Sequence, residues 1–310
     1  MVAGILLALL SARGIGPKKA NAILKSLKSY DLEDLETAIE TILAPKLDPQ
    51  EWKALLCTGN DMFSRSIEAG INVIDFLSES YPSLLKRLEN PPLAIFVKGH
   101  PSAMTTQLPV AIVGSRSPST YAEQHGKSIS QIVSCKASAV ISGLAIGCDT
   151  IAHREALLNC VPTVAVVAHG LDTIYPKANA KLATQIIESG GCLVSEYPVG
   201  IPPRPNQFIA RDRIQAGLSH AGVLLQSSSS GGSMHAMRSL QKIRAAIGAL
   251  VPPANARHAV EWGGSVDLLE LKETIALDPE LVGFLDDIGK LLVKNVPVLP
   301  RKAIIQETLF

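Results

Sequence analysis

The sequence is poor in aromatic residues and carries almost no net charge. Phe, Trp and Tyr make up 4% of its 310 residues, and the formal net charge is only +1. This balance argues against a protein coated with basic residues, although it permits a local basic groove. With so few aromatic rings, any bound nucleic acid would be held through its phosphates more than through stacked bases, so its binding would be sensitive to salt.

Paired cysteines and long apolar runs are also missing. The five cysteines, at positions 57, 135, 148, 160 and 192, contain no C-x-x-C pair. This scatter favours reduced thiols in a cytoplasmic protein over a disulfide framework, and no Cys or His spacing predicts a metal site. No apolar run is long enough to span a membrane, and residues 1–10 are expected to form a helix rather than a signal peptide. We expect no metal, no cofactor and no membrane contact.

The centre of the chain repeats one pattern, an apolar run followed by a glycine turn and a helix. The run Val110–Val113 breaks at Gly114-Ser-Arg116, and the run Ser138–Ser142 breaks at Gly143 before a helix that begins at Thr150. This succession is typical of a βαβα unit. The turns do not form a G-x-G-x-x-G fingerprint, so we infer no dinucleotide cofactor.

Apolar runs of the same kind recur at roughly 25–30 residues, the spacing of successive βα units. We expect strands around Ile112, Val140, Val164, Leu193, Leu224 and Ala249. Their nearly continuous hydrophobicity predicts an α/β fold with a mostly parallel sheet, buried on both faces and closed by residues 247–251. An earlier run, Pro91–Gly99, is bounded by prolines and is also expected to be a strand, because it is rich in β-branched and aromatic residues.

In a parallel sheet the turns that follow the strands lie along one edge, where ligands bind. Glycine turns before helix N-termini present backbone N–H groups to an anion, and Arg116 adds a charge suited to phosphate. Asp149 is placed to cap its helix, Arg211-Asp-Arg213 is expected to open another, and the turn Ser227–Ser233 precedes a basic helix. The alternative is a set of ordinary βα turns, with the serine-rich turn as a flexible linker.

The pattern divides the chain into three parts: a helical unit over residues 1–65, the α/β domain over 66–262, and a helical C-terminal tail over 263–310. In the first part, residues 6–27 predict two helices joined by a glycine turn. The turn resembles a helix-hairpin-helix (SAM-like) motif, in which Gly14 and Gly16 present N–H groups to phosphate and Lys18 and Lys19 assist. The alternative is a hairpin that contacts only protein.

No arrangement for catalysis stands out in the sequence. His153 lies four residues after Asp149, which suggests a catalytic pair, but a histidine packed against its sheet is the favoured interpretation. Glu196 is accompanied in the sequence by no second carboxylate, metal cluster or activated nucleophile, so the groups that hydrolysis requires are not evident. We expect a protein without enzymatic activity.

Several segments together resemble the DNA-processing protein A (DprA/Smf) family. They follow in the family's order over about residues 5–252: Leu77–Leu85, Asn90–Gly99, Ala111–Arg116, Ile141–Asp149, Ala152-His153, Gly170–Asp172, Tyr175-Pro176, Ser195–Pro198 and Arg211–Ile214. The resemblance implies an extended Rossmann-like domain that binds single-stranded DNA. It also implies that the protein protects incoming strands during natural transformation (competence), hands them to the recombinase RecA and acts as a homodimer.

Carried over by position, the resemblance assigns roles to individual residues. Arg116 and Lys177 are expected to contact DNA through their positive charges, and the Phe208 ring is expected to stack on a base. The other DNA-binding or phosphate-binding residues are expected to be Gly114, Ser115, Ser142, Gly143, Arg211, Arg213, Gly232 and Ser233.

The chain also departs from this family. Asp212 stands where the family usually has Asn, and Gln226 lies where it has Glu; the stretch after Pro253, which supports dimerisation and RecA contact in the family, is not recognisable. Two other functions stay open. One is a Rossmann-like nucleotide-binding enzyme or sensor related to the lonely-guy phosphoribohydrolases, whose Pro-Gly-Gly-x-Gly-Thr-x-x-Glu motif is absent here. The other is a structural subunit of a larger DNA-handling complex.

Overall fold

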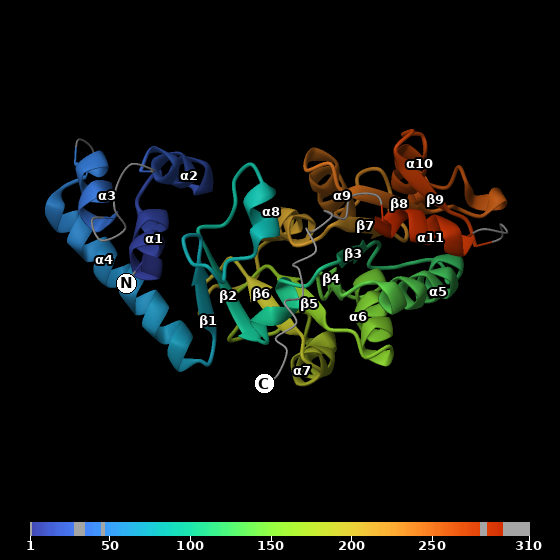
Figure 1. The fold of residues 1–310 in the computed structure, drawn as a ribbon, viewed down its shortest axis with the longest axis horizontal. Helices are drawn as coiled ribbons and strands as arrows, with labels where there is room; N and C mark the ends of the chain where they lie inside the picture. Colours follow the sequence, from blue (N-terminus) through green and yellow to red (C-terminus); the bar gives the residue numbers. More distant parts are fainter. Residues whose placement is uncertain (1, 28–34, 45–46, 280–283, 294–310) are drawn as a thin grey trace, which may run out of the picture.

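The computed structural model describes residues 2–27, 35–44, 47–279 and 284–293, and it contains one sheet that extends from β1 to β9, with the N-terminal helices beyond its β1 edge (Figure 1). The strand order is β1-β2-β6-β5-β4-β3-β7-β8-β9. β1 and β2 pair antiparallel and β2 joins β6 antiparallel, while every other pairing is parallel. The bounds are Asn72–Asp75, Ala94–Gly99, Pro109–Val113, Ala139–Ser142, Thr163–Val167, Cys192–Ser195, Ala221–Leu224, Ala246–Leu250 and Thr274–Leu277 for β1 to β9. The predicted mostly parallel sheet is confirmed.

Helices cover both faces of this sheet, which explains why its central strands are apolar throughout. Because side chains alternate along a strand, Ile112 of β3 faces one layer while Ala111 and Val113 face the other. The first layer contains α5 (Thr120–Lys136), α6 (Cys148–Leu158), α7 (Ala180–Glu188) and α11 (Phe284–Val293); the second contains α8 (Pro205–Gly217), α9 (Ser233–Lys242) and α10 (Gly263–Leu269) (Figure 1).

The far edge of the sheet differs from the prediction. Residues 247–251 do not close it, because β9 pairs with β8 in parallel at Ile247↔Thr274 and beyond. Residues 274–277 were expected within a helical tail, but the helix α10 ends at Leu269 and the following strand buries Leu277 completely. The apolar residues between 268 and 277 therefore belong first to a short helix and then to a strand. The prediction of one continuous helical pattern over these residues is wrong. Leu281 and residues 294–310 lie outside the described residues.

The N-terminal helices pack against the other edge of the sheet. They are α1 (Val2–Ser11), α2 (Pro17–Ser26), α3 (Leu35–Leu43) and α4 (Pro49–Glu68). α1 is apolar all round, as a buried helix must be, and it lies between α4 and the strands β1 and β2 (Figure 1). Leu7 shares a hydrophobic cluster with Phe96 of β2, so the helical unit and the sheet are joined by a continuous core.

Two helices begin earlier than the sequence predicts. α6 begins at Cys148, after Gly147 at φ +79°, so Asp149 lies inside the first turn and is not the N-cap. α8 begins at Pro205, a residue favoured at the first helical position, so Arg211 and Arg213 lie in the middle of the helix and do not open it. No helix in the described part of the chain is long and apolar enough to cross a bilayer.

Candidate nucleic-acid interface at the switch point of the sheet

A pocket of about 360 Å³ lies at the carboxyl ends of the central strands. After β3 the chain moves outward in one direction through β4, β5 and β6, and then returns to the other side of β3 as β7. Ligands in open α/β sheets bind at this kind of switch point. The lining residues include Gly114, Ser115, Arg116, Asp149, Phe208, Arg211, Asp212, Ser227, Ser228, Gly231, Gly232 and Ser233.

Two serine-glycine turns, which follow the neighbouring strands β3 and β7, form one side of the pocket. The Ser115 backbone N–H donates to the Gln226 carbonyl at 2.7 Å, which ties the turns together. A hydrogen bond of 2.9 Å joins the hydroxyls of Ser233 and Ser227. α9 begins at Ser233 with Gly232 as its N-cap, and the N–H groups of Met234 and His235 donate back to the carbonyls of Gly231 and Gly232. This wall offers hydroxyls and the positive end of a helix to an anion.

Arg211 forms the floor of the pocket and is 6% exposed. Its Nη1 donates to the carbonyls of Gly143 at 2.8 Å and Val166 at 2.5 Å, so it bridges the ends of β4 and β5. Gly143 leaves room for this guanidinium, since a β-carbon there would lie 2.7 Å from Arg211 Cζ. The Ser142 hydroxyl donates to the Ile112 carbonyl at 2.7 Å. Ser142 and Gly143 thus support the pocket from behind and do not line it.

Two buried carboxylates, which the sequence-based site did not include, complete the pocket. Asp149 is 6% exposed and Asp212 is 8% exposed. Asp212 Oδ1 lies 3.1 Å from Arg211 Nε. Burial raises the pKa of Asp212 to about 7, although Arg211 acts in the opposite direction. Burial also raises the pKa of Asp149, whose carboxylate accepts from the Ala145 backbone N–H at 3.2 Å.

His153 does not form a catalytic pair with Asp149. Its ring is completely buried, and Nδ1 shares a hydrogen bond of 2.7 Å with the Thr163 hydroxyl. Burial lowers the pKa of this histidine to about 3, with a further contribution from Arg211. The side chain is a neutral core residue, as the favoured interpretation predicts. In the described residues no three His, Cys, Asp or Glu side chains gather into a possible metal site.

The mouth of the pocket carries an exposed cation on an aromatic face. Arg116 is exposed, and its guanidinium lies over the Phe208 ring at 5.4 Å from the centroid. The Tyr175 ring also packs near Phe208, with 5.8 Å between the two ring centroids. These three residues also line a second cavity of about 390 Å³, with Pro203, Arg204 and Pro205. The two cavities therefore meet at Arg116 and Phe208.

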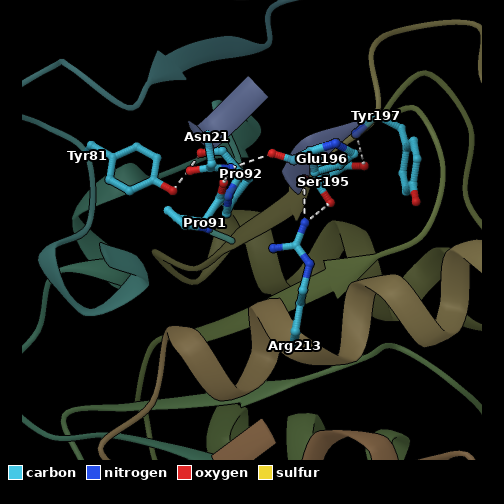
Figure 2. A network of polar contacts seen from close by, with 9 residues as sticks. Asn21, Tyr81, Pro91, Pro92, Ser195, Glu196, Tyr197 and Arg213 are labelled. Atoms are coloured by element: carbon cyan, nitrogen blue, oxygen red, sulfur yellow. Dashed lines mark hydrogen bonds and ion pairs between the residues drawn. The ribbon is translucent and has the colours of Figure 1, made fainter. Parts of the chain in front are cut away.

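Arg213 is paired with Glu196 (Figure 2) and lines neither of these two cavities. Its Nη2 donates to both carboxylate oxygens, at 2.5 and 2.6 Å, and the two side chains are 22% and 12% exposed. Although Arg213 follows Arg211 by only two residues, the helical turn separates their directions. The sequence shows Glu196 at a strand end but gives no sign of this ion pair. Lys177 is exposed in a 3₁₀ turn and lines neither cavity.

The N-terminal hairpin is present between α1 and α2. Gly14 adopts φ +77°, and neither Gly14 nor Gly16 has an atom that a β-carbon would meet within 4 Å. Lys18 and Lys19 are exposed, and Lys19 Nζ donates to the Gly14 carbonyl at 2.8 Å. The turn is open to solvent. Directly behind it, the Asn21 amide donates to the Pro91 carbonyl at 2.9 Å and ties α2 to the α/β core (Figure 2).

Comparison with known proteins identifies relatives of this chain. The sequence profile of the family described as DNA recombination-mediator protein A matches residues 72–278. Protein Smf of Escherichia coli is 38% identical over 157 residues, which cover 51% of this chain and 42% of Smf. DNA processing protein DprA of Bacillus subtilis is 32% identical over 190 residues, covering 60% of this chain and 64% of DprA. The chain thus spans less than two thirds of the length of these relatives.

Two solved structures extend the comparison. DNA processing protein A from Streptococcus pneumoniae superimposes on this chain with a TM-score of 0.75 and is 24% identical to it. The match covers 93% of this chain and 96% of that protein, and it supports the fold. DNA processing protein A from Helicobacter pylori, described for its single-stranded DNA binding mode, gives a TM-score of 0.61 at 28% identity, covering 72% and 95% of the two chains. The profile match extends over more than half of the residues and contains the pocket, so the chain belongs to the DNA recombination-mediator protein A family.

Proposed function

We propose that this protein binds single-stranded DNA along the carboxyl edge of its sheet and acts as a recombination mediator, without turning over its ligand. One observation carries the proposal: the pocket at the switch point combines an anion-binding wall with an exposed Arg116 stacked on Phe208. Helix N-termini and arginine suit a phosphate, and an aromatic face suits an unpaired base. The single-stranded DNA binding described for the relative from Helicobacter pylori supports the choice of ligand.

The two adjoining cavities suggest the path of the strand. A phosphate in the pocket would contact Ser115 and the start of α9, while the neighbouring base would lie against Phe208 and Tyr175. Arg204 is exposed and lines the second cavity, and Lys177 is exposed in the 3₁₀ turn two residues after Tyr175. Both add positive charge to the path. Because paired bases cannot stack on a protein ring, this site favours a single strand over a duplex.

Family membership supports a proposal about the wider role. We propose that the bound strand is delivered to RecA, that the protein works as a homodimer, and that Gly14, Gly16, Lys18 and Lys19 add a second phosphate contact. Light scattering of the purified protein measures the oligomer, and co-purification with RecA measures the partnership. The exposed hairpin turn supports the second contact, and a Lys18→Ala, Lys19→Ala double variant tests it.

Fluorescence anisotropy with labelled oligo-dT and a matched duplex, each over a salt series, tests the proposal. We expect tighter binding to the single strand and a steep salt dependence. Arg116→Ala should weaken binding about tenfold at low salt, for all sequences alike, and should flatten the salt slope by about 0.7, the contribution of one phosphate contact on a single strand.

Lys136→Ala is the matched control for the loss of one charge. Lys136 is exposed at the C-terminal end of α5, and the chain enters β4 shortly after it, so it lies at the opposite edge of the sheet from the pocket. This variant should bind as the wild type does. Equal affinity of the wild type and the Arg116 variant at low salt would contradict the proposed site.

The geometry also supports a second candidate, a nucleotide-binding sensor or enzyme. A phosphate cradle beside the buried carboxylates of Asp149 and Asp212 has the groups needed to hold a phosphate and a sugar hydroxyl together. The turn Ser229–Ser233 lacks the catalytic glutamate of the lonely-guy motif. Competition of AMP or dTMP against oligo-dT distinguishes the two, because a mononucleotide site would release the strand at micromolar nucleotide.

A further inference from the structure

Asp212 is an acidic side chain inside a pocket suited to an anion. It lies on α8, lines the pocket and is 8% exposed. A carboxylate in this position repels a phosphate, whereas a protonated carboxyl group can donate a hydrogen bond to it. The protonation state of Asp212 therefore changes the sign of its contribution to phosphate binding.

The pocket contains a nearly balanced set of charges around this residue. Arg211 on the same helix, Arg116 from the turn after β3 and Asp149 from α6 act on Asp212 electrostatically. With both carboxyl groups ionised, the two arginines are neutralised. When one carboxyl group is protonated, the pocket carries one net positive charge. Since charges interact strongly in a partly desolvated site, this single proton matters for an anionic ligand.

We propose that Asp212 sets the affinity of the pocket for DNA phosphate, with the protonated carboxyl group as the binding form and the carboxylate as the form that weakens binding. This inference rests on the proposed binding of single-stranded DNA. It makes Asp212 a residue that determines affinity and its dependence on pH, in direct contact with the ligand.

The direction of the pH effect follows from the surroundings of Asp212. Burial raises its pKa to about 7, with Asp149 adding to the effect and the two arginines opposing it. Between pH 6 and pH 8 the protonated fraction then falls from about nine tenths to about one tenth. If the protonated form binds, the affinity for DNA falls about tenfold across this range.

Other titratable groups near α8 must be separated from Asp212. Asp149 has its own pKa raised by burial, and His153 stays neutral because burial lowers its pKa to about 3. On α8 itself, Arg213 is paired with Glu196. α9 packs against α8 and carries His235, which is half-buried, and His169 is buried at the end of β5.

The test is fluorescence anisotropy with an oligo-dT that has a 5′-hydroxyl, so that no terminal phosphate titrates, at pH 6 and pH 8 and constant ionic strength. The wild type should lose about tenfold in affinity between these values. Asp212→Asn has the same size, no charge and an amide donor, so it should bind equally at both values and at pH 8 match the wild type at pH 6. His235→Gln, the matched control, should keep the dependence of the wild type.

Each outcome bears on a different statement. Binding by the wild type that does not change with pH, or an Asp212→Asn variant that retains the tenfold loss, overturns the role of Asp212 while leaving the DNA site intact. Loss of the pH dependence in His235→Gln also overturns it. Absence of binding by the wild type at both pH values overturns the proposed function itself, and this inference with it. The wild-type comparison requires no variant to fold.

Discussion

The contact between Gly143 and Arg211 gives the most direct test of how the pocket is built. A β-carbon at position 143 would lie 2.7 Å from Arg211 Cζ and closer still to Nη1. The guanidinium cannot move aside freely, since Nη1 donates to the carbonyls of both Gly143 and Val166. Gly143→Ala must therefore either displace Arg211 or spread the strands.

The cost can be worked out from either response. Hydrogen bonds to a charged group contribute about 1.5–3 kcal/mol each, and a buried arginine that leaves its acceptors also leaves two carbonyls unpaired. Overpacking without this loss costs about 1–3 kcal/mol. We expect Gly143→Ala to lower the free energy of unfolding by about 3 kcal/mol and to abolish binding of single-stranded DNA.

Equilibrium unfolding in urea is the assay, with the free energy taken from the midpoint and slope. The matched control is Gly232→Ala, a second glycine of the pocket, where φ is −56° and a β-carbon would meet nothing within 4 Å. Its free energy of unfolding should stay within about 0.5 kcal/mol of the wild type. A similarly small change in Gly143→Ala would refute the reasoning, because it would mean that Arg211 is not fixed by its two carbonyls.

Two further predictions concern the network in Figure 2. Glu196→Gln should lower the free energy of unfolding in urea by about 1–3 kcal/mol, because it leaves the partly buried Arg213 with a neutral partner. DNA binding should not change, since Arg213 does not line the pocket. Tighter DNA binding by this variant would contradict that position and make Arg213 a DNA contact. Asn21→Ala should lose about 1–2 kcal/mol, since it leaves the buried Pro91 carbonyl without its donor, and it should speed limited proteolysis in the N-terminal helices. Lys25→Ala, exposed on the same helix, is its control, and equal proteolysis of the two variants would show that the Asn21 bond does not hold that unit in place.

The central strands were predictable from the sequence because a strand that is buried on both faces is a continuous run of apolar residues. The runs around Ile112, Val140, Val164 and Leu193 are apolar without alternation, and each is a strand that pairs in parallel with at least one neighbour. The edge at β9 was not predictable in this way. A four-residue strand that is only partly covered carries little hydrophobic pattern, and it follows directly on a short helix.

Helix boundaries were less predictable than the existence of the helices. Arg211 was expected to open a helix after a proline-rich loop ending at Phe208, whereas α8 begins at Pro205. Asp149 was expected as a cap because it directly precedes a helix expected to begin at Thr150, whereas α6 begins at Cys148. The observed starts place Asp149 in the first turn of α6 and Arg211 in the middle of α8, and both side chains line the pocket.

The sequence by itself determined the α/β class, the order of the strands along the chain and the glycine turns at their carboxyl ends, because these depend on local hydrophobicity and on residues that only turns accept. The tertiary structure decided which turns meet. It placed β7 beside β3, so that the turns Gly114–Arg116 and Ser227–Ser233 form one pocket. It also paired Arg213 with Glu196 and brought Asp149 of α6 and Asp212 of α8 into the same pocket. Contacts between residues far apart in sequence depend on the order of the strands within the sheet and on the rotation of each helix about its axis. The residue pattern of a single segment determines neither of these.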